Sequence, residues 1–242
     1  MSQVSKRSEL DQDEEIVLLP LFPLRLVLFP GQVLPLHIFE PRYRLMVNQC
    51  IQERQPFGVV LMRDDTADWR EYKQDVALPY EVGTTAHIRQ VERLSDGRLN
   101  IVTMGLHRFR VRRLRFDQPY LQAEVSAFPL DDASAKSNPH DLRALRRLLV
   151  DYVDLLTKVM DAEIDVDEIP SDPRTLAFLA ASALQISWED KQALLAAPAL
   201  PSLLTSELDL LRREKVMLNF MWATEGRVND QVLGPTGYLY PN

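Results

Sequence analysis

The chain has 242 residues, enough for one large domain or two smaller ones, and 28 basic against 35 acidic residues give a net charge of −7. This charge weakens any general attraction to nucleic acid or anionic lipid. No apolar run approaches the ~20 residues of a membrane span, because prolines and charged residues interrupt every candidate. The single Cys50 excludes an internal disulfide and a thiolate metal cluster, which fits a reducing cytoplasm.

Composition divides the chain into five predicted segments. Residues 1–14 lack the apolar core of a secretory signal and are expected to form a disordered lead-in. Predicted strands dominate residues 15–129 and predicted helices dominate residues 139–225. The small, polar composition of 130–138 is typical of a linker between two cores. We expect residues 226–242 to form an extended tail.

The stretch 18–44 combines short apolar runs with prolines. Pro20 and Pro23 interrupt the first run, so we predict short, edge-like strands. Pro30-Gly31 predicts a tight turn before the next strand. Pro41 then begins a helix, because proline suits the first helical position, where its missing N–H has no intrahelical acceptor.

Further strands are predicted after this helix. Residues 57–62 form a buried strand, and Ser95-Asp96-Gly97 predicts a hairpin between two antiparallel strands. In 106–116, the apolar residues change parity between Val111 and Leu114. A β-bulge near Arg112-Arg113 would return them to one face. About six short strands with one inserted helix predict a small twisted barrel.

The second half has the signals of four helices. Asn138-Pro139 and Asp172-Pro173 each place a capping side chain before a first-turn proline, and Ser187 suggests a third helix start. A long final helix is predicted over 204–222, after the break at 198–201. These elements predict a four-helix bundle.

The order of LPLFPL, VLFPG and LPLHIFEPRYR resembles the N-terminal substrate-binding domain of the ATP-dependent Lon protease family, in its free-standing version. Further segments follow in the family's order, namely FGVV, VGTTA, DGR, GLHRFRV and PYLQAEV. The resemblance covers Glu15 to about Trp222 and implies that the barrel is PUA-like. The predicted fold class is therefore α+β, with a PUA-like β-barrel carrying one inserted helix and a C-terminal four-helix bundle.

A full-length Lon protease carries an ATPase and a Ser-Lys peptidase domain, and neither is predicted here. The chain has no GxxxxGK[ST] phosphate loop and no GxSxG nucleophile elbow. No two histidines have the spacing of a helical zinc pair, and Cys50 lacks a neighbouring cation that would activate it. The acidic run at 161–168 is typical of a solvated loop, with weak calcium binding as the alternative. We predict no enzymatic activity, no metal and no cofactor.

The predicted binding surface surrounds the second strand and the helix that follows it. Its apolar residues exceed what one face of a short strand can bury, and an exposed patch with a free strand edge can bind an unfolded peptide. The resemblance also implies substrate recognition here. Alternatively, Ile38 and Phe39 belong to the core, and Arg42 with Glu40 forms a structural ion pair. The predicted peptide- or partner-binding residues are Leu34, Leu36, His37, Phe39, Arg42, Tyr43 and Met46.

A second candidate is the arginine-rich strand, since PUA-like barrels in other families bind RNA. Against this, no aromatic residues interleave on the arginine face, and Glu92 and Glu124 are available for cross-strand pairing. The alternative nucleic-acid-binding residues are Arg108, Arg110, Arg112 and Arg113.

The leading hypothesis is a non-enzymatic, cytoplasmic binding module that does not contact membranes. It would recognise apolar segments of unfolded proteins, or a partner protein, in a groove between barrel and helices. A protease or an ATPase would be a further partner. The RNA-binding protein and an unrecognised hydrolase, whose titratable groups converge only in the fold, stay open as alternatives.

Overall fold

A computed structural model describes residues 15–63, 78–131, 138–160 and 169–228. The predicted lead-in, the acidic run, most of the linker and most of the tail lie outside the described residues. In chain order the elements are β1 (Ile16–Leu24), β2 (Val33–Ile38), α1 (Pro41–Glu53), β3 (Phe57–Leu61), β4 (Val82–Arg93), β5 (Leu99–Arg115), β6 (Gln122–Ala127), α2 (Pro139–Met160), α3 (Pro173–Ala183), α4 (Trp188–Leu195) and α5 (Leu200–Val228). The predicted mixed α+β class is confirmed.

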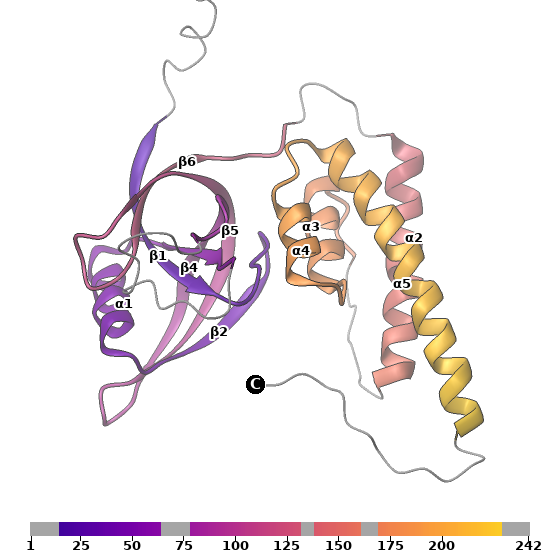
Figure 1. Cartoon of the computed structure of the whole chain (residues 1–242), viewed down its shortest axis with the longest axis horizontal. Helices are drawn as coiled ribbons and strands as arrows, with labels where there is room; N and C mark the ends of the chain where they lie inside the picture. Colours follow the sequence, from indigo (N-terminus) through magenta and orange to yellow (C-terminus); the bar gives the residue numbers. More distant parts are fainter. Residues whose placement is uncertain (1–14, 64–77, 132–137, 161–168, 229–242) are drawn as a thin grey trace, which may run out of the picture.

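The six strands form one sheet that closes on itself. β1 pairs with β3 and β6, β4 lies between β3 and β5, and β5 also pairs with β6. These pairings complete a ring of five strands, so the sheet is a barrel, and β2 extends it by pairing with β5. Figure 1 shows the curved barrel on one side and the helices on the other. The PUA-like type stays a prediction.

From the prolines of β1 we predicted a short, edge-like strand, and this prediction is wrong. The strand has nine residues and two partner strands. Among the described strands, its residues 16–20 pair with β6 and its residues 21–24 with β3. Each half therefore keeps one unpaired side, which is where a sheet tolerates proline. The six-residue β2, which pairs with β5 alone among the described strands, fits the edge prediction.

Two local predictions for the barrel are confirmed. The β5–β6 register shifts between Val111 and Arg113, which is the expected bulge. Arg93 pairs with Leu99 across the predicted hairpin, where Gly97 has φ +83°. Two further register shifts between β4 and β5 were not predicted.

The predicted helix caps are also confirmed. Asn138 Oδ1 accepts a hydrogen bond from His140 N at 3.0 Å, and Asp172 Oδ2 accepts one from Thr175 N at 2.9 Å. Ser187 Oγ accepts one from Asp190 N at 3.1 Å. Each side chain satisfies a backbone N–H that has no partner within its own helix.

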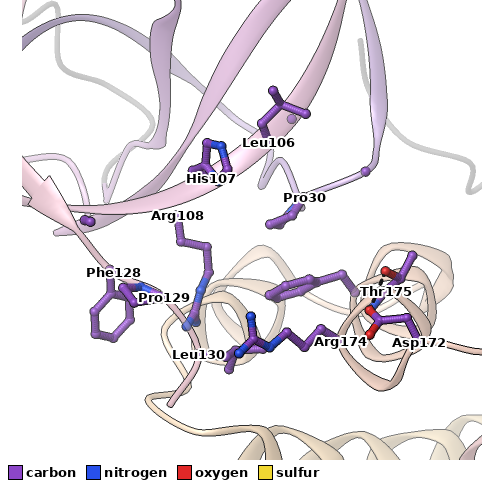
Figure 2. Close-up of a pocket in the computed structure, with 14 residues that line it drawn as sticks. Pro30, Leu106, His107, Arg108, Phe128, Pro129, Leu130, Asp172, Arg174 and Thr175 are labelled. Carbon is purple, nitrogen blue, oxygen red and sulfur yellow. Dashed lines mark hydrogen bonds between the residues drawn. The ribbon is translucent and has the colours of Figure 1, made fainter. Parts of the chain in front are cut away.

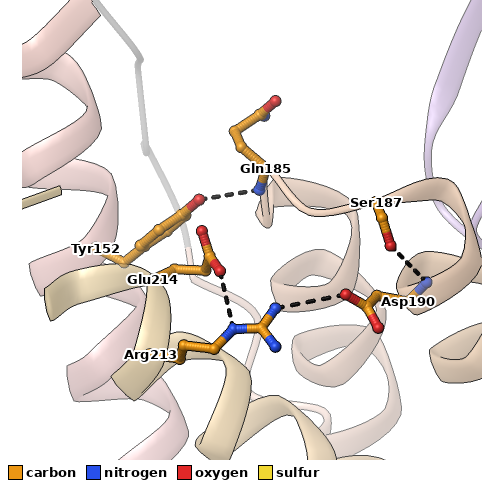
Figure 3. Close-up of polar contacts among 6 residues, drawn as sticks. All are labelled: Tyr152, Gln185, Ser187, Asp190, Arg213 and Glu214. Atoms are coloured by element: carbon orange, nitrogen blue, oxygen red, sulfur yellow. Dashed lines mark hydrogen bonds and ion pairs between the residues drawn. The ribbon is translucent and has the colours of Figure 1, made fainter. Parts of the chain in front are cut away.

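The short helices α3 and α4 lie between the barrel and the long helices α2 and α5, which run side by side (Figure 1). Figure 3 shows polar contacts that join these helices. The Tyr152 hydroxyl of α2 accepts a hydrogen bond from Gln185 N at 2.9 Å, and Arg213 of α5 pairs with Asp190 of α4 at 3.4 Å. A regular four-helix bundle stays a prediction. Within the described residues, no helix combines the length and apolarity that crossing a bilayer requires.

Barrel and helices share part of their hydrophobic core. Phe29, Leu61 and Val82 of the barrel half pack in the same buried cluster as the helical core residues. In addition, Gln192 of α4 donates from Nε2 to the carbonyl oxygen of Val82 at 2.9 Å, in a buried position. This common core fixes the helices against one side of the barrel, whereas α1 lies on the side away from them (Figure 1).

Candidate functional site

A cleft of about 430 Å³ lies between the barrel and α3 (Figure 2). Its walls come from the β1–β2 connection, from the middle of β5, from the end of β6 with the residues after it, and from the first turns of α3. The lining residues are Pro30, Gly31, Gly105, Leu106, His107, Arg108, Ala127, Phe128, Pro129, Leu130, Asp172, Arg174, Thr175 and Phe178. Most are apolar, with a few polar groups, as in many ligand sites.

Two glycines shape the barrel wall of the cleft. Gly31 N donates to Gly105 O at 2.8 Å, and Gly105 N donates to Gln32 O at 2.9 Å. A Cβ at Gly105 would collide with the carbonyl oxygen of Phe29, so the two chain segments can approach only without a side chain here. Gly31 has φ +84°, which favours glycine in the turn.

Arg108 crosses from β5 to the helices at the base of the cleft (Figure 2). Its side chain is 4% exposed, and Nη1 donates to the carbonyl oxygens of Leu195 at 2.5 Å and Ala197 at 2.7 Å. Its guanidinium carbon lies 4.6 Å from the ring centroid of Phe128. Burial, followed by the charge of Arg110, lowers its pKa to about 10, so it stays charged at neutral pH.

The first turn of α3 forms the opposite wall. Asp172 Oδ2 accepts hydrogen bonds from the backbone N of Thr175 at 2.9 Å and from its hydroxyl at 2.7 Å. These bonds, the one from the hydroxyl first, lower the pKa of Asp172, so its carboxylate is ionised at neutral pH. Arg174 follows Asp172 closely and is exposed.

The predicted peptide-binding residues lie elsewhere, and none of them lines this cleft. Leu36 and His37 line a separate groove of about 480 Å³ along β2, β4 and β5. Phe39 is 60% exposed and stacks on His37, whereas Ile38 belongs to the core as the alternative interpretation expected. Leu34 is half-buried.

The remaining predicted residues belong to α1. Tyr43 and Met46 are buried in the barrel core, so they do not form part of the exposed surface. Arg42 Nη2 lies 2.9 Å from Glu40 Oε2, so the predicted structural ion pair is confirmed. Whether this surface binds a peptide stays a prediction.

The arginine strand has a largely structural role. Besides the bonds of Arg108, Arg112 Nε donates to Ser126 Oγ at 2.9 Å, and Arg115 forms an ion pair with Glu124 at 2.7 Å. Arg110 stacks on the ring of Phe128 at 4.3 Å. Arg113 is exposed. The predicted cross-strand partner Glu124 is thus confirmed, and a continuous basic face for RNA is not supported.

Sequence reasoning did not identify the cleft residues on α3 or those after β6. The cap at Asp172 was recognised, but nothing in the local pattern indicated that it would face the barrel. Arg108 was noted only as one arginine of a stripe. Among the described residues, no three histidine, cysteine, aspartate or glutamate side chains gather closely enough to hold a metal ion.

Comparison with known proteins identifies the family. The model of the ATP-dependent protease La (LON) substrate-binding domain matches residues 18–213, which include all cleft residues and all of the barrel except the first two residues of β1. The chain belongs to the LON substrate-binding domain family. This confirms the resemblance seen in its sequence motifs.

Solved structures agree with the LON assignment. The Lon N-terminal domain protein from Xanthomonas campestris has a TM-score of 0.58 and 27% identity, and the match covers 80% of this chain and 98% of that one. The N-terminal domain of the Mycobacterium avium complex Lon protease has the same TM-score of 0.58 at 18% identity, covering 81% and 98% of the two chains, which shows the fold alone.

Full-length relatives of this LON chain are proteases. The Lon protease of Anaeromyxobacter dehalogenans (strain 2CP-C) is 28% identical over 86% of this chain, and Lon protease 2 of Myxococcus xanthus is 31% identical over 83%. The matches cover 25% and 24% of those two proteins. The chain thus spans about a quarter of the length of the curated relatives that it matches.

Proposed function

We propose that the chain is a binding module that recognises apolar segments of unfolded proteins, or of a partner protein, in the cleft between the barrel and the helices. The observation that carries this proposal is the cleft itself, with an apolar lining contributed by both halves of the chain. A pocket of this size with few polar groups suits a short stretch of apolar side chains. Membership in a family described as substrate-binding supports a protein client.

A binding role without catalysis fits the chemistry of the lining. None of the described lining residues is a serine, cysteine or lysine, and the one hydroxyl, on Thr175, donates to Asp172 within the helix cap. This hydroxyl–carboxylate pair caps α3 together with the backbone bond from Thr175 N, so its role is accounted for by the helix start. The proposal therefore assigns no reaction and no cofactor to this chain.

We also propose a cellular process, a partner and domain bounds for the module. Because the relatives are Lon proteases, we assign it to protein quality control in the cytoplasm, with a protease or an ATPase as its partner. It consists of a PUA-like barrel over 15–129 and a four-helix bundle over 139–225, joined by the linker 130–138.

Peptide binding can be measured by fluorescence anisotropy with a labelled, unfolded, apolar-rich polypeptide. Leu106→Asn removes an apolar group from the cleft without touching the buried core, because Leu106 is half-buried. Loss of this contact should weaken binding about tenfold. Leu45→Asn, at an exposed position on α1, is the matched control and should leave the affinity unchanged.

A second variant separates the cleft from the surface predicted on β2 and α1. Phe39→Asn removes the exposed aromatic ring of that surface. If Phe39→Asn weakens binding and Leu106→Asn does not, the site lies on β2 and α1 instead of the cleft. If the protein binds single-stranded RNA but not the peptide, and the RNA affinity falls steeply with salt, the client-binding proposal is rejected.

A further inference from the structure

One edge of β1 has no partner strand beside its first residues. Residues 16–20 pair with β6 on one side, and β3 occupies the other side only from Leu21 onward. Among the described residues, no strand or isolated bridge pairs with 16–20 on that second side. In Figure 1 the start of β1 projects beyond the curved strands of the barrel. We call this unpaired side of residues 16–20 the open edge of β1.

The backbone groups that face the open edge follow from hydrogen bonds further along β1. Leu21 N donates to Leu121 O on the β6 side at 2.8 Å, and Leu24 O accepts a bond from the residue after β3 at 3.2 Å. Successive residues of a strand direct their backbone groups to opposite edges. Even-numbered residues of β1 therefore face the β3 side. Ile16 and Leu18 thus direct their N–H and C=O groups to the open edge.

The side chains beside the open edge are apolar on both faces of the strand. Ile16, Val17 and Leu18 are 57%, 50% and 51% exposed. Neighbouring side chains of a strand point to opposite faces, so neither face of this segment is buried in the barrel core. Burial within this fold gives no reason for three large apolar residues in succession here, whereas contact with another chain does.

The open edge also lacks the features that protect free edges in native sheets, such as a central proline, a lysine or a bulge. β2, which pairs with β5 alone among the described strands, has Pro35 in its middle. In the open edge, residues 16–19 carry neither a charge nor a proline, and Pro20 lies at the end next to β3. No register shift interrupts its pairing with β6. This edge is therefore able to pair with a further strand.

We propose that the open edge of β1 binds an extended, apolar segment of a client polypeptide as an additional strand of the sheet. The backbone of the client pairs with Ile16 and Leu18, in line with β3, and its side chains contact those of residues 16–18. Strand addition gains its hydrogen bonds from the backbone, so it suits unfolded chains of varied sequence. This inference rests on the proposed function and adds a second contact for the same client.

The position of the open edge favours the client of the cleft as its ligand. Ile16 pairs with Ser126 of β6, and the residues that follow, 127–130, line the cleft. An added strand would lie two strand spacings of ~4.8 Å from β6. One extended client segment can therefore contact both the cleft and the open edge.

Two other occupants fit less well. A second copy of the chain could pair edge to edge, but residues 16–20 span only ~17 Å. Two such edges would bury far less than the ~1,200 Å² of a stable interface. The residues that precede the strand, 8–14, are mostly acidic or polar, and such residues are depleted in strands.

Backbone-methylated peptides test strand addition on the full chain by fluorescence anisotropy. The parent is a labelled, apolar-rich peptide. Its matched version carries N-methyl groups on two neighbouring central residues, whose N–H groups face opposite edges of an extended chain. Methylation keeps the side chains but prevents either edge of the peptide from pairing. The methylated peptide should bind about tenfold more weakly, as expected for the loss of about two backbone hydrogen bonds.

Two proline variants locate the effect. Leu18→Pro removes an N–H from the open edge and leaves the β1–β6 hydrogen bonds intact, as Pro20 does in the same strand. It should weaken binding of the parent peptide about tenfold and abolish the difference between the two peptides. Val33→Pro, at the exposed first residue of β2, is the matched control and should keep both affinities.

A second variant covers the case that Leu18→Pro unfolds the protein, which urea denaturation reveals. Leu18→Lys replaces a half-exposed side chain and introduces the charge that protects natural edges. It should also weaken binding of the parent peptide and reduce the difference between the two peptides.

Equal binding of the two peptides, or a difference that survives in the folded Leu18 variants, would overturn the inference. If the affinity still falls on Leu106→Asn, the proposed function stands and the client binds in the cleft alone. A dimer in sedimentation velocity that Leu18→Pro dissociates, with an unchanged peptide affinity, would assign the open edge to a second copy and reject the inference. Binding of neither peptide to the parent protein would reject both proposals.

Discussion

Arg108 of β5 donates a hydrogen bond from Nη1 to the backbone carbonyl oxygen of Leu195, the last residue of α4, at 2.5 Å. The last carbonyls of a helix have no intrahelical partner and carry a partial negative charge. A buried guanidinium satisfies them, and here it also joins two halves of the chain. The residue that the sequence suggested as an RNA contact therefore holds the barrel against the helices.

Replacement of this arginine should loosen the junction. Arg108→Met keeps the length of the side chain but leaves the carbonyls of Leu195 and Ala197 without their donor, which should lower the free energy of unfolding by about 2–4 kcal/mol. Urea denaturation measures the change. Arg113→Met, on the same strand but exposed, should stay within about 0.5 kcal/mol. Equal effects of the two variants would contradict this role.

Glu207 of α5 should make stability depend on pH. Its side chain is fully buried, and neither carboxylate oxygen has a hydrogen-bond partner within the described residues. Burial raises its pKa well above the usual 4.5, so the folded state keeps a proton that the unfolded state releases. Stability should therefore fall as the pH rises above about 4.5 and on through the folded-state pKa.

Glu207→Gln should remove this dependence, because the amide does not ionise. Urea denaturation of both proteins from acidic to alkaline pH should show nearly equal stability at low pH and a growing advantage of Glu207→Gln at high pH. Glu189→Gln changes an exposed carboxylate of α4 and should leave the pH profile unchanged. A parallel profile for Glu207→Gln and the parent protein would argue against a buried, protonated glutamate.

Cys50 should be almost unreactive in the folded protein. Its side chain is 1% exposed, and burial, with a smaller contribution from the charge of Glu53, raises the thiol pKa to about 12. The thiolate is the reactive form, so reaction with a disulfide reagent at pH 8 should be more than about 100-fold slower than in urea. Because the chain has one cysteine, the rate reports this site alone. Similar rates in both solutions would place Cys50 at the surface.

The two cleft glycines should respond differently to alanine. Gly105→Ala forces a Cβ against the carbonyl oxygen of Phe29 and should cost about 2–3 kcal/mol, with weaker peptide binding as the wall shifts. Gly31→Ala meets open space, and only its φ of +84° opposes the change, so it should cost about 1 kcal/mol. Thermal or urea unfolding of both variants measures the two losses of stability. A larger loss for Gly31→Ala than for Gly105→Ala would show that the close approach of Phe29 to Gly105 does not require glycine.

The sequence by itself determined the features that depend on near neighbours. The family motifs, the caps at Asn138, Asp172 and Ser187, the hairpin at Asp96-Gly97 and the bulge beside Arg113 were all predicted and confirmed. Each follows from side chains, turns or alternation within a few residues, so the pattern is complete in the local sequence.

Only the tertiary structure decided how these pieces meet. β1 keeps its prolines because it changes partner from β6 to β3, and Tyr43 and Met46 of the predicted surface turn inward to the core. At the base of the cleft, Arg108 reaches a carbonyl 87 residues away along the chain. Burial and hydrogen bonding at such a separation depend on how the barrel and the helices pack together, and no local spacing of residues encodes that packing.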